Sequence, residues 1–338
     1  MSTLCLAGSI KGLFVLLISL VLNRKAQLLE RIICKYIGDR PGPLLLVFGS
    51  MHGNEPAGAK ALELVNKMLE VEPITNEGFS YRGAFVGMLG NKQAVEQNER
   101  FLERDLNRSW TVENVQRISK LPKHELQAED LEMAEILQHF DLLIKELNPT
   151  KVIVLDLHTT SSFGGIFTLP TDDEESIRIA KALHAPVIKG MLEGIKGTVL
   201  HYFNSENLGV DTTALAFESG QHNEKLSVNR AIAAIVNCMR TIQAIDPNHV
   251  EHQHDKILKE YSRSLPKVAQ LVTKYGIKEV GAFKMKPNFK NFQPVSKGEA
   301  LAYDAKELVV APDDGLILMP LYQKRGEDGF FLIKELEN

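Results

Sequence analysis

Two short apolar runs, each followed within a few residues by a histidine, place the strongest constraint on how this chain can fold. Residues 44–48 (Leu-Leu-Leu-Val-Phe) lead into a loop that holds His52 and Glu55, and residues 152–155 (Val-Ile-Val-Leu) lead into Asp156 and His158. Short apolar runs bounded by turn residues are typical of buried strands. Parallel sheets place their ligand sites at the carboxyl ends of strands, where both histidines are expected to fall.

Strand-like and helical segments alternate along most of the chain. Strands are expected at 32–37, 44–49, 81–89, 152–157, 197–203 and 213–217, and helices at 56–70, 130–147, 172–183 and 223–244. This alternation predicts an α/β/α sandwich around a mostly parallel mixed sheet. We expect a hydrolase domain over residues 26–250, then a linker helix and a small C-terminal all-β domain over 251–338, with an apolar N-terminal segment at 1–25.

Composition excludes some functions. The net charge of -4 gives no basic surface for a nucleic-acid partner. Cys5, Cys34 and Cys238 are odd in number and far apart, so no disulfide framework is expected and a cytoplasmic setting is favoured. His249, His252 and His254 have polar neighbours and are interpreted as part of a solvated linker, not as a metal site.

The apolar segment at residues 4–22 leaves three interpretations open. It is of marginal length for a membrane span, which needs about twenty predominantly apolar residues, and Lys11 lies in its middle. It also lacks the early basic region and the cleavage site of a signal peptide. We expect a packed helix or an artefact of an upstream start codon, with a membrane anchor as the alternative.

His52, Glu55 and His158 have the chemistry of a catalytic metal site. Two imidazoles and one carboxylate suit a single zinc ion that keeps a fourth position open for water. The alternative is that His52 and Glu55 only cap backbone amides at a helix start. Glu218 follows an apolar segment and is expected to be the general base, with a pKa raised by its neighbours; the alternative is a residue that simply ends a strand.

The ordered set of His52-x-x-Glu55, Asp105-Leu106-Asn107-Arg108, His158 and Glu218 resembles the succinylglutamate desuccinylase/aspartoacylase family, a branch of the zinc carboxypeptidase-like enzymes. The resemblance implies a zinc-carboxypeptidase-like sandwich and one zinc ion per chain.

The same resemblance implies roles for the polar residues around the metal. Asn107 and Arg108 would hold a substrate carboxylate, Arg100 would polarise the scissile carbonyl, and Asp105 would hold their loop in place. A solvated charged loop is the alternative for this segment. Asp156 lies two residues before His158 on a strand, so both side chains leave the same face. Asp156 is expected to fix the tautomer of a ligand histidine, although the sequence does not say which one.

The expected reaction is hydrolysis of the amide bond of a small N-acyl amino acid. The alternatives are a carboxypeptidase-like enzyme acting on short peptides and a binding protein without activity; a homo-oligomer is left open. Two departures argue against acetylaspartate as the substrate. Residues 207–217 lack the arginine of the aspartoacylase branch, and Phe330-Phe331 stands where that branch has a tyrosine. No second carboxylate pocket is evident that would indicate succinylglutamate.

Overall fold

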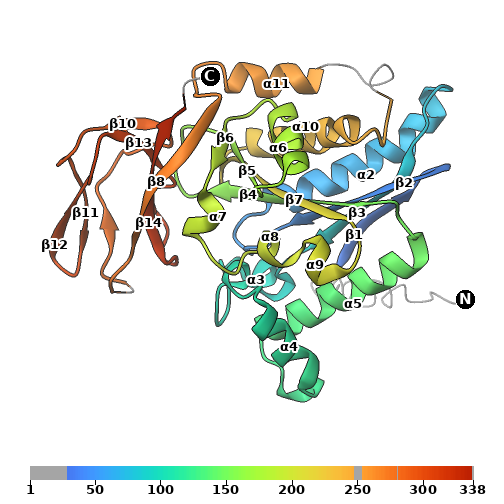
Figure 1. Cartoon of the computed structure of the whole chain (residues 1–338), viewed down its shortest axis with the longest axis horizontal. Coiled ribbons are helices and arrows are strands. Elements are labelled where there is room, and N and C mark those ends of the chain that lie inside the picture. Colours follow the sequence, from blue (N-terminus) through green and yellow to red (C-terminus); the bar gives the residue numbers. More distant parts are fainter. Residues whose placement is uncertain (1–28, 247–252, 280, 337–338) are drawn as a thin grey trace, which may run out of the picture. The chain divides into compact units, whose positions relative to one another are not determined.

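One mixed sheet of eleven strands forms the centre of the structure, a computed structural model that describes residues 29–246, 253–279 and 281–336 (Figure 1). In sheet order its strands are β1 (Ile32–Ile37), β3 (Arg82–Leu89), β2 (Arg40–Gly49), β4 (Val152–Thr160), β7 (Thr212–Gln221), β5 (Phe167–Pro170), β6 (Val187–Lys189), β8 (Val268–Gly276), β14 (Asp328–Glu335), β13 (Gly315–Leu318) and β10 (Gln293–Val295). The neighbouring strands β3, β2, β4 and β7 run parallel, which confirms the expected α/β architecture.

Helices cover both faces of the part of this sheet that holds β3, β2, β4 and β7, whereas β14, β13 and β10 extend beyond them (Figure 1). The helices of the described residues are α2 (Ala57–Thr75), α3 (Lys92–Gln97), α4 (Val112–Lys120), α5 (Glu129–Leu147), α6 (Glu174–Ala182), α7 (Met191–Gly194), α8 (Val199–Tyr202), α9 (Ser205–Leu208), α10 (Leu226–Thr241) and α11 (Gln253–Tyr261). Helices α2, α6, α10 and α11 pack in one apolar core, and α4, α5, α7 and α8 pack in the other.

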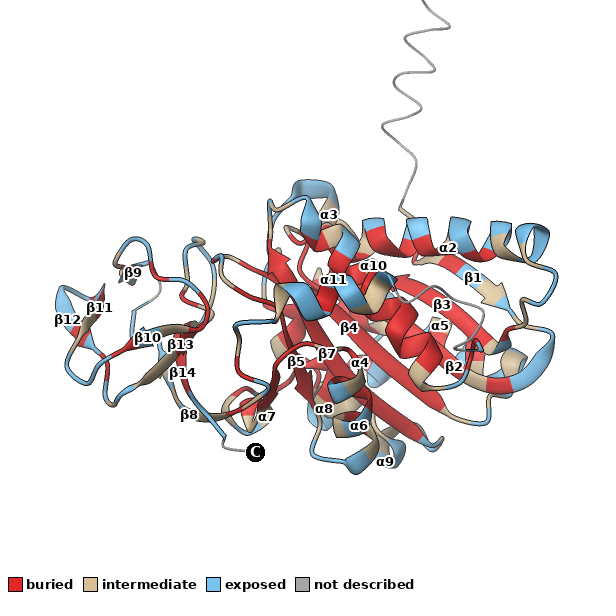
Figure 2. Cartoon of the chain, turned by 90° about the horizontal axis from the view of Figure 1, so that it is seen from above, coloured by how far each residue is buried: buried red, intermediate tan, exposed pale blue. Residues whose placement is uncertain are grey.

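The apolar run in β2 serves both cores because side chains alternate along a strand. Leu44, Leu46 and Phe48 pack on the side of α5, whereas Leu45 and Val47 pack on the side of α2. All residues of β4 and β7 are buried, as expected for strands covered on both faces (Figure 2). This is why these strands read as almost continuous apolar runs in the sequence.

The strand expected at residues 197–203 is wrong, because this segment contains helix α8. Val199, Leu200 and Phe203 are all buried at a spacing that suits a helix. Thr198 begins the helix with a capping box in which the His201 side chain returns to the Thr198 backbone amide. Periodicity alone did not separate a short buried helix from a strand here.

The C-terminal segment is largely β, as expected, but only part of it forms a separate sheet. Strand β8 pairs with β6 and with β14, so the large sheet continues into this segment. A second sheet holds β12 (Glu307–Val310), β11 (Ala300–Asp304) and β9 (Lys284–Met285). Residues Arg31–Asn338 form one compact unit, and the domain boundary expected at residue 250 stays a prediction.

Several sequence features fall at or beyond the limits of the description. The apolar segment at 4–22, with Cys5, lies outside the described residues, as do His249 and His252. His254 is half-buried within α11 instead of lying in a solvated linker. Cys34 and Cys238 are buried free thiols. Among the helices of the described segments, none has the length and apolar character needed to cross a membrane.

Candidate metal centre and substrate pocket

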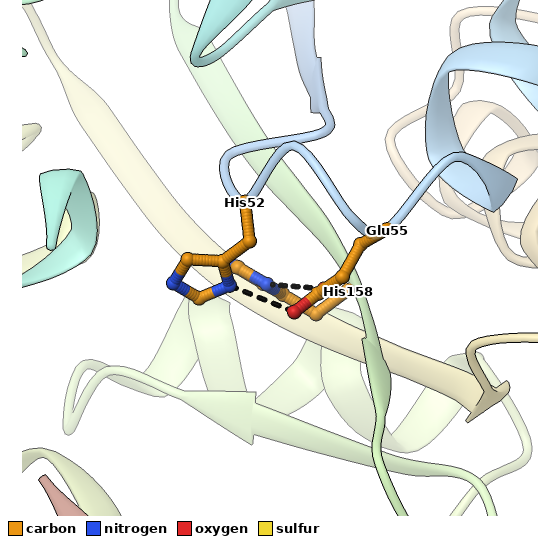
Figure 3. A group of neighbouring side chains, drawn as sticks. All are labelled: His52, Glu55 and His158. Atoms are coloured by element: carbon orange, nitrogen blue, oxygen red, sulfur yellow. Dashed lines mark hydrogen bonds and ion pairs between the residues drawn. The ribbon is translucent and has the colours of Figure 1, made fainter. Parts of the chain in front are cut away.

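His52, Glu55 and His158 meet in one buried group at the end of two neighbouring parallel strands (Figure 3). His52 Nδ1 lies 2.8 Å from Glu55 Oε1, and His158 Nδ1 lies 3.1 Å from Glu55 Oε2. One potential ligand atom from each residue lies within 4.8 Å of the others. The three side chains can therefore hold one metal ion.

The loop between β2 and α2 gives His52 and Glu55 their positions. Ser50 has a φ of 56°, which turns the chain sharply after β2, and its hydroxyl donates to the Glu55 carbonyl at 2.9 Å. Gly53 packs against α3 so closely that an added Cβ would lie 2.1 Å from the carbonyl carbon of Ala94. The amide of Thr159 on β4 donates to Glu55 Oε2 at 2.9 Å and fixes that carboxylate.

Each histidine has an acid on the side away from the triad. His52 Nε2 lies 3.2 Å from Asp105 Oδ1, and His158 Nε2 lies 2.7 Å from Asp156 Oδ2. When Nε2–H donates to these carboxylates, each Nδ1 lone pair points toward Glu55 and is available for a metal. The structure thus answers which histidine Asp156 contacts.

The charge balance of the group favours a cation. Burial by itself would raise the pKa of Glu55, but the two histidines outweigh it and hold that pKa well below its ordinary range. Burial likewise lowers the pKa of His158, yet Asp156 and Glu55 raise it well above the usual value. The buried acids thus favour positive charge between them, which a protonated histidine or a divalent metal ion can supply.

Glu218 lies beside the triad, because β4 and β7 pair in a register that puts it next to His158. Burial, with help from Glu55 and Asp156, raises the pKa of Glu218 to about 8. Its Oε2 atom is buried and has no hydrogen-bond partner among the described residues. Such an atom is free to bind a water molecule or a substrate group, and this group of residues fits a metal ion with a base next to it.

The comparisons with known proteins agree with this geometry. The catalytic-domain model of the Succinylglutamate desuccinylase/Aspartoacylase family matches residues 41–242, more than half of the 338-residue chain. The chain belongs to this family. It is therefore a hydrolase of a family that acts on N-acyl amino acids, with a buried His-Glu-His group able to hold one metal ion.

Individual relatives are distant from this chain. A succinylglutamate desuccinylase of Pseudomonas putida (strain GB-1) is 25% identical over 293 residues, which cover 82% of this chain and 78% of the relative. A probable aspartoacylase of Trichodesmium erythraeum (strain IMS101) is 31% identical over 123 residues, 36% of this chain and 37% of the relative. The solved ectoine utilization protein EutE (DoeB) of Ruegeria pomeroyi has a TM-score of 0.58 at 17% identity, over 88% of this chain and 86% of that one, and shows the shared fold.

Arg100 lies beside the metal group and is held by Asp105. Its Nε and Nη2 atoms donate to Asp105 Oδ2 at 3.2 and 3.0 Å, and its Nη1 atom lies 3.6 Å from Glu55 Oε1. Asp105 also accepts from the backbone amide of Asn107 at 2.9 Å. Asp105 thus connects the Arg100 side chain, His52 and the start of the Asn107-Arg108 turn.

Asn107 and Arg108 have different surroundings. Asn107 Oδ1 accepts from the Val199 amide at 2.8 Å, and its Nδ2 atom lies 3.1 Å from His158 Nε2. Arg108 donates through Nη1 to the Asn107 carbonyl and through Nη2 to Asp328 Oδ2, both at 2.9 Å. Lys274 lies on the other side of this carboxylate, with Nζ 3.1 Å from Asp328 Oδ1.

All the site residues expected from the sequence except Asp105 line one pocket. The pocket also contains residues that the sequence did not point to. Among them are Thr159, Thr160, Ser161, Leu169, Leu192, Ile195, Thr198, Leu200, Ala216, Gln323 and Asp328, whereas Phe331, which also lines the pocket, belongs to the Phe330-Phe331 pair noted in the sequence. Asp328 begins the last strand, two residues before the Phe330-Phe331 pair, but nothing in the sequence near it indicates that it reaches Arg108.

Proposed function

We propose that this chain is a zinc-dependent amidohydrolase that cleaves the amide bond of N-acyl amino acids. The observation that carries the proposal is the buried His52-Glu55-His158 group with Glu218 beside it, whose buried Oε2 atom has no hydrogen-bond partner among the described residues. Membership of a family that hydrolyses such amides supports the same reaction class.

His52, Glu55 and His158 would hold the zinc ion. Two nitrogen ligands and one carboxylate, with a position left for water, are typical of catalytic zinc sites. When bound, zinc lowers the pKa of a water molecule and polarises a carbonyl group. Asp105 and Asp156 keep both histidines in the tautomer that presents Nδ1 to the ion.

Glu218 moves the proton in this proposal. Its Oε2 atom accepts a proton from the attacking water and delivers it to the nitrogen of the leaving amine. In the protein without metal, burial keeps the pKa of Glu218 at about 8. A positive charge close by lowers the pKa of a carboxyl group, so the zinc-loaded protein would hold Glu218 ionised and ready to accept a proton near neutral pH.

Arg100 and Arg108 would contact two different parts of the substrate, the scissile carbonyl and the carboxylate. Arg100 projects its Nη1 toward Glu55, where it can stabilise the negative charge that develops on the carbonyl oxygen. Asn107 and Arg108 would together hold the carboxylate of the amino acid, Arg108 through its planar guanidinium. Arg108 must exchange its contact with Asp328 for the substrate.

The test measures amine release from N-acyl amino acids and short peptides by the zinc-loaded protein. Glu218→Gln at equal zinc content is the matched control, and we expect it to be slower by about 10²–10⁴-fold. Equal rates in both proteins would remove Glu218 from the reaction. No hydrolysis of any N-acyl amino acid would overturn the proposed function, and a preference for peptides would favour a carboxypeptidase-like enzyme instead.

A further inference from the structure

We infer that the pocket favours N-acyl amino acids with one carboxylate and one hydrocarbon arm over dicarboxylic substrates. This inference rests on the proposed function and specifies the substrate class of the same site. It comes from two features of the pocket: an apolar surface that begins next to Glu218, and a supply of cationic groups that is sufficient for only one carboxylate.

The sheet itself forms the first part of the apolar surface. Ala216 lies two residues before Glu218 on β7, so both side chains point to the same face. In the sheet register Ala216 is flanked by Asp156 on β4 and by Leu169 on β5. The polar pair His158–Glu218 is therefore followed, two residues earlier on β7, by the apolar pair Ala216–Leu169 on the same face of the sheet.

Three other segments continue this surface. Leu192 in α7, Ile195 after it and Leu200 in α8 line the pocket, and Phe331 joins them from β14. All four pack in the same apolar core as Ala216 and Leu169. A hydrocarbon arm placed here replaces water against side chains that offer it no hydrogen bond, which favours its binding.

The charged groups of the pocket limit the number of carboxylates. Apart from the histidines, Arg100 and Arg108 are the cationic side chains in the pocket lining of the described residues. Arg100 is engaged by Asp105 through two nitrogens. Glu218, Glu327 and Asp328 also line the pocket, so a second substrate carboxylate would meet alkyl groups or other carboxylates. Burying a charge without a partner is strongly unfavourable.

The charges of the Arg108–Asp328–Lys274 group can balance one further carboxylate. Arg108 Nη2 and Lys274 Nζ both contact the single Asp328 carboxylate, at 2.9 and 3.1 Å. If a substrate carboxylate binds Arg108 in place of Asp328, Asp328 keeps Lys274 as its partner and is not left unpaired. Two cations against one acid thus match one further negative charge.

Paired substrates test the inference. We would compare N-acetylleucine with N-acetylaspartate, and N-pentanoylglycine with N-succinylglycine, so that the added carboxylate lies on the amine side in one pair and on the acyl side in the other. The zinc-loaded enzyme should have a kcat/KM at least about tenfold higher for the monocarboxylate of at least one pair and should not prefer either dicarboxylate. The pair with the larger ratio identifies the arm that contacts the apolar surface.

The same four compounds are measured by calorimetric binding to zinc-loaded Glu218→Gln, which separates the two proposals. Hydrolysis with a dicarboxylate preferred in either pair, or with equal rates in both pairs, overturns the inference but leaves the proposed function standing. Absence of hydrolysis overturns the proposed function. In that case the inference is judged by binding, and it fails if the dicarboxylates bind equally well or better.

A charge introduced on the apolar surface provides an independent test. Leu192 is half-buried and lines the pocket, so Leu192→Arg brings a cation to the apolar surface at a position where the side chain is not fully enclosed. It should shift the ratio of dicarboxylate to monocarboxylate kcat/KM upward by about tenfold. Leu142→Arg adds the same charge on the exposed side of α5 and should leave the ratio unchanged. If thermal melting shows that Leu192→Arg is unfolded, Leu192→Lys takes its place. An unchanged ratio in the folded variant contradicts the inference.

Discussion

The metal end and the substrate end of the pocket are built from the chain in different ways. At the metal end, His52 and Glu55 come from one loop, and His158 and Glu218 are neighbours in the register of two parallel strands. At the substrate end, Arg108 contacts Asp328, which is 220 residues away in the sequence. The metal end follows from strand order and local spacing, whereas the substrate end depends on how the C-terminal segment returns to the sheet.

The largest effect is expected from a change at the metal end. His158→Ala should lose zinc and reduce the activity on every substrate by at least about 10⁴-fold. His158 is both an expected metal ligand and the partner of the buried Asp156 carboxylate, and the substitution removes both contacts. Elemental analysis and initial rates on the same protein sample measure this. Retention of stoichiometric zinc with substantial activity would show that His158 is not a required metal ligand and that the metal end is not built from these strands.

A change behind the metal end should have an intermediate effect. Asp156→Asn keeps the shape of the side chain but weakens its hold on His158 Nε2. We expect zinc affinity to fall by about 10–100-fold, with little change in the preference among substrates. Competition with a chelator of known affinity provides the measurement. A changed substrate preference at full zinc occupancy would assign Asp156 to the substrate end instead.

At the substrate end, Arg108→Ala should affect only substrates with a free carboxylate. Converting that carboxylate to an amide should cost the parent enzyme about 2 kcal/mol or more, roughly 30-fold in kcat/KM, since the charge-assisted contact between the substrate and Arg108 is then lost. In Arg108→Ala the same conversion should cost far less. Acid and amide substrates on both proteins form a double-mutant cycle. Equal penalties in the two proteins would mean that Arg108 does not bind the carboxylate.

The smallest effect is expected from Asp328→Asn. The Asp328 carboxylate competes with the substrate for Arg108, and partly exposed ion pairs of this kind contribute little energy. The KM for a monocarboxylate substrate should therefore fall by about threefold, with kcat almost unchanged. Steady-state kinetics at saturating zinc gives both values. A rise in KM would indicate that Asp328 supports the carboxylate site and does not compete with it.

The sequence carried most of the fold and the metal end because both depend on local patterns. The runs before His52 and His158 predicted strands, and their order along the chain suggested a common sheet edge. The segment around Val199 was misassigned because a short buried helix and a strand have the same apolar composition. Its correct structure matters for the site, since the Val199 amide holds the Asn107 side chain.

The substrate end was less predictable for a physical reason. The contact of Arg108 with Asp328 and the place of Leu192 in the pocket depend on side chains brought together by tertiary packing. Neither Asp328 nor Leu192 has sequence neighbours whose spacing indicates a functional role. The absence of an arginine in residues 207–217 was visible in the sequence. The apolar surface that lines part of the pocket was not, because its residues come from separate segments.

A crystal structure of the zinc-loaded protein, with anomalous data collected at the zinc edge, tests the central claim most directly. We predict one zinc ion at about 2.0–2.2 Å from His52 Nδ1, His158 Nδ1 and a carboxylate oxygen of Glu55, with Glu218 beside the remaining open position. A zinc ion bound elsewhere, or ligand distances beyond about 2.5 Å in a fully loaded crystal, would contradict the assignment of the metal centre.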